Sequence, residues 1–147
     1  MYPLLQKKSL MMNPLKYDLT QLKVATCSMQ GWRKGMEDAH ICVLNIIPGV
    51  SLFGVFDGHG GEEVSAFVRN HFPVEMKKWL LSKKDMTYEQ GLTEVFQTMD
   101  ELLQTTEGKA ELNDIYTKCN KVQSSFLTKH SEDAANNVGC TGCVCIS

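Results

Sequence analysis

The apolar residues of the chain change their spacing at the glycine-rich segment 57–61, and this change limits the possible folds. Before the segment, the runs 40–47 and 51–56 are short and rich in β-branched and aromatic residues, and the dipeptide Pro48-Gly49 between them is a turn signal. The pattern therefore predicts an antiparallel hairpin followed by helices, which is an α+β fold. The helical spacing after the segment is carried by Val64, Phe67, Val68, His71 and Phe72.

Further elements are predicted from the alternation typical of strands and from the spacing typical of helices. We expect a short strand over 22–28, irregular structure at 57–61, and a helix end or kink at Pro73. A second helix should begin at the capping box 87–90 and continue to residue 103. Residues 106–137 form a polar insert with a weaker helical register, and 138–146 is typical of a strand. Residues 1–20 are expected to form an N-terminal arm, and residues 21–147 a single domain.

The composition excludes several classes of function. The 147 residues include 15 Lys and Arg against 17 Asp and Glu, so the chain has no positive field that would attract nucleic acid. Its apolar runs are far shorter than the about 18 residues of a membrane-spanning helix, and no apolar signal region follows the first lysines. Six cysteines are too few for a disulfide scaffold. We therefore expect a cytoplasmic or nuclear protein without a membrane or nucleic-acid partner.

Three cysteines near the C-terminus, Cys140, Cys143 and Cys145, raise the alternative of a small zinc-binding protein. A zinc site would need at least one further ligand, and Cys119 and His130 are the nearby candidates, at unusual spacing. Cysteine is also among the most frequently buried residues. The sequence therefore favours a core strand here over a zinc site.

Acidic residues occur at two points where a hard cation could bind. Glu37 and Asp38 are adjacent, and on extended backbone their carboxylates point to opposite sides. Asp57 follows an apolar strand, and Gly58 leaves its own carbonyl without side-chain cover. Carboxylates and backbone carbonyls are the ligands that divalent cations such as Mg²⁺ prefer. These residues are therefore candidate metal ligands.

Each of these residues also has an ordinary explanation when taken alone. Asp57 and Gly58 form a dipeptide common in turns. His59 would more often be a surface histidine than an acid catalyst, and Arg33 a solvent-facing charge. Trp32 is expected to pack in the core or at a strand edge. The combination and order of the residues are more informative than any one of them.

That combination resembles the metal-dependent protein phosphatases of the PPM class, also called type 2C. The resemblance rests on the segments 28–33, 36–40 and 53–61, which have the order, spacing and strand context of that family. It covers about 24–72 closely and returns at 138–141. It implies an antiparallel β-sandwich flanked by helices, incomplete in this chain. It also implies hydrolysis of phosphoserine and phosphothreonine in phosphoprotein substrates.

The resemblance further implies a site for two Mg²⁺ or Mn²⁺ ions. In it, Asp57 bridges the ions, and Glu37 and the Gly58 carbonyl reach one of them. Asp38 holds metal-bound water, Arg33 grips the substrate phosphate, and His59 donates a proton to the leaving oxygen.

One alternative function remains open from the sequence. The further metal-binding aspartates of the family lie in later parts of its domain, and no Asp after Asp57 stands in a motif that matches them. Asp133, in the polar insert, is a poor substitute. The alternative is therefore a truncated, catalytically inactive phosphatase-like module with a binding or regulatory role, and residues 1–147 alone are expected to be inactive.

Overall fold

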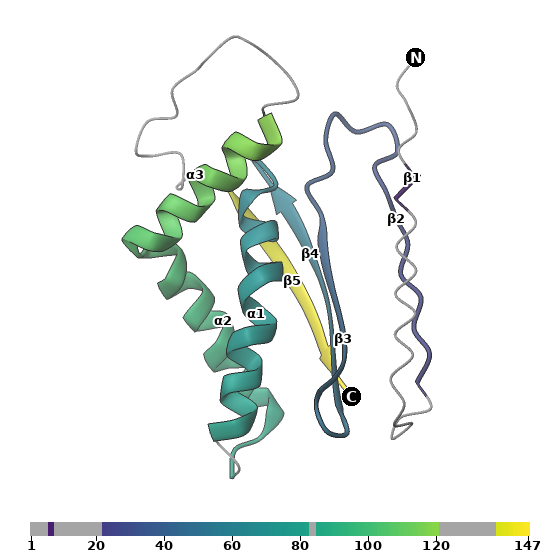
Figure 1. The fold of residues 1–147 in the computed structure, drawn as a ribbon, viewed down its shortest axis with the longest axis vertical. Coiled ribbons are helices and arrows are strands. Elements are labelled where there is room, and N and C mark those ends of the chain that lie inside the picture. The colour runs from purple at the N-terminus through teal and green to yellow at the C-terminus, as the bar shows by residue number, and fades with distance from the viewer. Residues whose placement is uncertain (1–5, 8–21, 83–84, 121–137) are drawn as a thin grey trace.

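The computed structural model describes residues 6–7, 22–82, 85–120 and 138–147 (Figure 1). Most of the expected N-terminal arm and the second half of the polar insert lie outside these residues. The elements are β1 (Gln6–Lys7), β2 (Ser28–Met29), β3 (Ala39–Ile47), β4 (Val50–His59), α1 (Glu63–Ser82), α2 (Tyr88–Gln104), α3 (Thr106–Asn120) and β5 (Gly139–Ile146).

The larger sheet is antiparallel and has β4 at its centre, in the order β3-β4-β5. Strands β3 and β4 form the predicted hairpin, in which Ala39 pairs with Phe56, and Gly49 in the connecting turn has a positive φ of 81°. On the other side of β4, Leu52 pairs with Ile146 of β5. The predicted strand at 138–146 is therefore confirmed.

Strand β4 is longer than its sequence indicates. The prediction of irregular structure at 57–61 is wrong for the first three residues, because β4 continues to His59. Asp57 pairs with Thr141, Gly58 with Cys140, and His59 with Gly139. The extension is stabilised by hydrogen bonds to a strand about 80 residues later in the chain. Local glycine content gives no information about such a partner.

The strand predicted at 22–28 is mostly wrong. Only Ser28–Met29 is a strand, and residues 22–27 have no regular structure. Strand β2 pairs with β1, Lys7 opposite Ser28. Figure 1 shows this pair on the opposite side of the larger sheet from the helices. The alternation at 22–28 therefore does not extend the larger sheet.

The helices cover one face of the larger sheet (Figure 1). Of the helix end or kink expected at Pro73, the end is wrong, because helix α1 runs through this residue. Pro73 cannot donate a backbone hydrogen bond, but the side chains of Phe72 and Met76 on either side are 0% exposed. Burial of these side chains compensates for the missing bond, at about 1.5–3 kcal/mol for each.

Helices α2 and α3 follow the predicted pattern. Thr87 caps α2 by a capping box with Gln90, as expected, and Val95 and Met99 are buried on its inner face. Helix α3 begins the polar insert, and Leu112 anchors it to the core. The helical register predicted for the insert is thus confirmed as far as residue 120.

The main core lies between the helices and the larger sheet. Phe56 and Leu52 of β4 are 0% exposed and meet Phe67 and Phe72 of α1, and Phe56 lies 5.8 Å from Phe72 between ring centroids. The fold is α+β, as predicted, with one three-stranded antiparallel sheet that is part of the expected sandwich. Among the described residues, no helix is long and apolar enough to cross a membrane.

Candidate functional site

The last residues of β4 place the candidate carboxylate Asp57 on the face of the sheet away from the helices. Side chains alternate along the strand, with Phe56 and Gly58 buried toward the helices, while Asp57 and His59 are exposed. Asp57 is thus held by the central strand of the sheet, with its carboxylate accessible to solvent.

Asp38 lies at the same end of the sheet as Asp57. The last pair of the β3-β4 ladder is formed by Ala39 and Phe56. Directly beyond this pair come Asp38, which precedes Ala39, and Asp57, which follows Phe56. Asp38 is exposed, like Asp57. The hairpin therefore brings together two carboxylates that are 19 positions apart in the sequence.

Glu37 and Gly58 are in direct backbone contact. Gly58 is buried, and a Cβ atom at this position would collide with the backbone carbonyl oxygen of Glu37. The hydroxyl of Ser65, near the start of α1, donates a hydrogen bond to the same Glu37 carbonyl. Ser65 is 1% exposed, so this bond is shielded from water. Only glycine therefore fits at 58, and α1 holds the backbone of Glu37 in place.

Ser65 is a residue of the site that the sequence did not reveal. It is a small polar residue within the apolar stripe of α1, beside Val64. Its hydroxyl lies close to two carbonyls, those of Glu37 and Glu62, 3.0 Å from the latter. A serine on a buried helix face is the one available signal, because a buried hydroxyl needs a partner.

Arg33 lies in the turn between β2 and β3. Its backbone N–H donates to the Gln30 carbonyl at 3.4 Å, and the Gln30 side-chain amide donates back to the Arg33 carbonyl at 2.8 Å. The Arg33 side chain is exposed, and within the described part of the chain no carboxylate lies at ion-pair distance from it. The guanidinium is therefore available for an external anion.

Trp32, in the same turn, does not pack as expected. Its side chain is 94% exposed, so the expectation of a core or strand-edge residue is wrong. The turn directs it into solvent, where it contacts neither sheet nor helix.

His59 ends β4 and lies against β5. A Cβ atom added to Gly139 would be 2.6 Å from the His59 Nε2 atom and 2.8 Å from Cε1, so the imidazole covers this glycine. The ring is exposed and stands at the same end of the sheet as Asp57. His59 thus lies two residues beyond Asp57, at the same end of the sheet as the candidate carboxylates.

The candidate metal ligands do not form a complete cage by themselves. Among the residues that the structure describes, no group of three or more His, Cys, Asp or Glu side chains is arranged to hold a metal ion. Hard oxygen donors nevertheless come from adjacent backbone segments, namely Glu37, Asp57 and the Gly58 carbonyl. The chemical type of these donors fits Mg²⁺ or Mn²⁺.

The three C-terminal cysteines are not arranged as a zinc site. Cys140 faces the helices, whereas Cys143 and Cys145 are exposed on the opposite face of β5. The strand is confirmed, but these two cysteines are not buried in the core. Burial raises the pKa of the Cys140 thiol, and the negative charges of Asp100 and Asp57 raise that pKa further.

Comparison with known proteins gives matches to one protein family. The profile of the family described as Protein phosphatase 2C matches residues 22–147. The Paramecium tetraurelia protein named Probable protein phosphatase 2C 4 is 44% identical over 122 residues, which cover 83% of this chain and 36% of that protein. Protein phosphatase 2C 1 of the same organism is 55% identical over 89 residues, or 60% of this chain and 29% of the relative.

A plant relative shows the same pattern. Probable protein phosphatase 2C 60 of Arabidopsis thaliana is 36% identical over 125 residues, which cover 79% of this chain and 33% of that protein. The chain therefore spans about a third of the length of these curated relatives. The profile match covers all of the larger sheet, the three helices and the candidate site. The chain belongs to the protein phosphatase 2C family.

Proposed function

We propose that this protein is a metal-dependent protein serine/threonine phosphatase that uses Mg²⁺ or Mn²⁺ and acts on phosphoproteins in the cytoplasm or nucleus. The observation that supports this proposal best is the meeting of Asp38 and Asp57 at one end of the hairpin, with Glu37 packed on Gly58. The family match over residues 22–147 includes all of these positions.

The donor set suits the difficulty of the reaction. Phosphate monoesters hydrolyse extremely slowly in water, so a catalyst must neutralise negative charge and supply a nucleophile at neutral pH. Asp57, Glu37 and the Gly58 carbonyl would hold the divalent cations. Cations bound there would lower the pKa of an attacking water and neutralise the phosphoryl oxygens.

Three further residues would act on the substrate and the water. Arg33, which has an unpaired guanidinium in the described part of the chain, would bind two phosphate oxygens. Asp38 would accept a hydrogen bond from the attacking water and orient it. His59 would donate its proton to the leaving serine or threonine oxygen.

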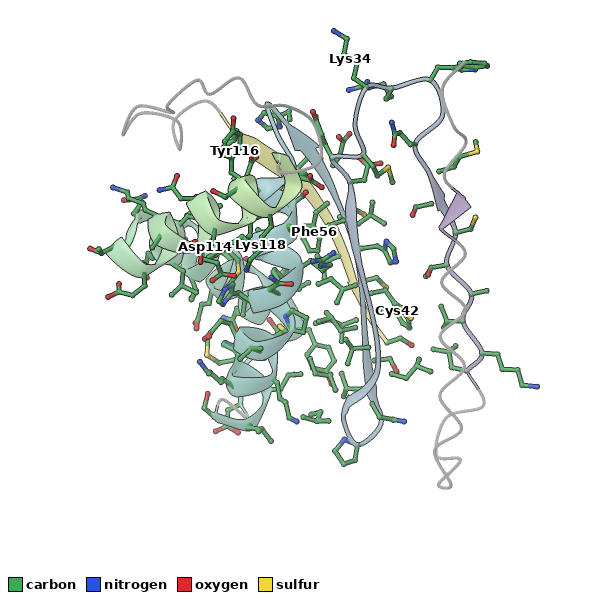
Figure 2. The ribbon with its side chains drawn as sticks, turned by 45° about the horizontal axis from the view of Figure 1, so that its top comes forward. Lys34, Cys42, Phe56, Asp114, Tyr116 and Lys118 are labelled. Carbon is green, nitrogen blue, oxygen red and sulfur yellow. The ribbon has the colours of Figure 1, made fainter. Side chains whose placement is uncertain are left out.

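The test is the substitution Asp57→Asn in the full-length protein. Asparagine keeps the size of the side chain but removes the negative charge and one carboxylate oxygen, so phosphopeptide hydrolysis with Mn²⁺ should fall by about 10³-fold or more. Asp114→Asn is the matched control, because Asp114 is exposed on α3, on the helical side of the molecule (Figure 2). Parent-like turnover by Asp57→Asn would show that Asp57 is not a metal ligand.

A second candidate function is a catalytically inactive module that binds phosphorylated partners through Arg33. It is favoured by the finding that the described residues contain no group of three side chains placed to hold a metal. Calorimetry with Mn²⁺ separates the two functions. A phosphatase should bind two ions per chain, whereas the inactive module should bind a phosphopeptide equally well with and without Mn²⁺.

A further inference from the structure

The turn before β3 displays a large apolar side chain that the proposed chemistry does not use. Trp32 is 94% exposed, more than any other large apolar side chain among the described residues. The next most exposed are Leu81 at 60% and Met29 at 58%. Exposed tryptophans are frequent energetic centres of protein interfaces, because the indole offers a large apolar area at little entropic cost.

The backbone that carries Trp32 is held in a defined turn. Gly31 has a positive φ of 62°, which an L residue adopts only with strain. Two hydrogen bonds between Gln30 and Arg33, of 3.4 and 2.8 Å, close the turn that contains Trp32. The backbone of Trp32 is therefore held in a defined turn before a partner binds, which lowers the entropic cost of binding.

The position of Trp32 relates it to the substrate phosphate. It is the residue directly before Arg33, so the two Cα atoms are about 3.8 Å apart. An extended peptide advances about 3.3 Å per residue. A side chain one or two residues from a phosphate held by Arg33 would thus come within reach of the indole.

The charge around the turn indicates which side chain would be accepted. Lys34 is exposed and stands clear of the sheet and helices at the tip of this loop (Figure 2). Together with Arg33 it makes the surroundings of the indole positive, which disfavours a substrate lysine or arginine there. An apolar side chain remains as the favourable partner for the ring.

We propose that Trp32 is a specificity-determining residue, which packs against an apolar side chain flanking the phosphorylated serine or threonine of the substrate. This inference rests on the proposed phosphatase function. It predicts that the enzyme prefers phosphopeptides with leucine beside the phosphorylated residue over the same peptides with glycine at that position.

The experiment compares Trp32→Ala with the parent in the full-length protein on three substrates. These are p-nitrophenyl phosphate and two phosphopeptides that differ only in leucine or glycine beside the phosphothreonine. For the leucine peptide, kcat/KM should fall by about 30-fold, the size of a typical interface hot spot. It should stay within about twofold for the other two substrates, which lack the contact. Trp32→Phe should restore most of the loss, and Leu81→Ala should change none of the rates.

Other outcomes separate this inference from the proposed function. An equal loss on all three substrates, or a lower unfolding midpoint of Trp32→Ala, would show that Trp32 is a packing residue and overturn the inference. Equal rates for the two peptides in the parent would also overturn it, while leaving the phosphatase function intact. A parent inactive on all three substrates would overturn the proposed function first and the inference with it.

Discussion

Replacing Gly58 with alanine should damage both the stability and the activity of the full-length protein. The new Cβ atom would collide with the Glu37 carbonyl oxygen and lie 3.1 Å from both the Ser65 Oγ atom and the Gly61 carbonyl oxygen. Two of these three neighbours are backbone atoms, which cannot rotate away as a flexible side chain can. Glu37 must therefore move, and its hydrogen bond from Ser65 must lengthen or break.

The expected cost follows from three opposing effects. Overpacking of this kind costs about 1–3 kcal/mol, and loss of the shielded hydrogen bond costs about 1 kcal/mol. Alanine in a strand interior recovers about 0.5–1 kcal/mol relative to glycine. The net loss in the free energy of unfolding should be about 2 kcal/mol. Because the displaced segment carries Glu37, we also expect Mn²⁺ to bind more weakly and turnover to fall by about 10²-fold.

Urea unfolding and Mn²⁺ calorimetry would measure the two effects of Gly58→Ala. Gly35→Ala is the matched control, since a Cβ atom at Gly35 has no neighbour within 4 Å. The control should keep the unfolding midpoint and the Mn²⁺ affinity of the parent. If Gly58→Ala did the same, the close contact between the two segments would be refuted as a requirement of the site.

Three further substitutions or reactions test other parts of the structure. Arg33→Ala should raise KM for a phosphopeptide about 10-fold or more with little change in the unfolding midpoint, because the exposed guanidinium forms no ion pair in the described part of the chain. A large loss of stability without a KM effect would show that Arg33 is a structural residue. Thr87→Ala should lower the free energy of unfolding by about 1 kcal/mol through loss of the capping box with Gln90, as measured by urea unfolding. In residues 1–147, iodoacetamide near pH 8 should modify Cys143 before Cys140, because Cys140 is half-buried and its raised pKa leaves less thiolate. Peptide mass spectrometry would follow the two reactions, and faster modification of Cys140 would contradict this order.

Some elements could be predicted because their causes are local. The hairpin of β3 and β4 depends on the Pro48-Gly49 turn between two apolar runs. The start of α2 depends on Thr87 and Gln90, three residues apart, which satisfy each other's backbone groups. The segments 28–33, 36–40 and 53–61, with their order and spacing, were also sufficient to indicate the family.

The outline of the α+β fold and the candidate site residues other than Ser65 were thus predicted from the sequence alone. Tertiary structure decided where β4 ends, because the ladder that extends it to His59 is formed with the distant β5. It also decided that Pro73 lies inside a helix and that Trp32 faces solvent. The contact between Glu37 and Gly58 likewise requires α1, whose Ser65 holds the Glu37 carbonyl from 28 positions away. Except for the exposure of Trp32, these outcomes depend on hydrogen bonds and packing between residues far apart in the sequence, and local periodicity carries no record of such contacts.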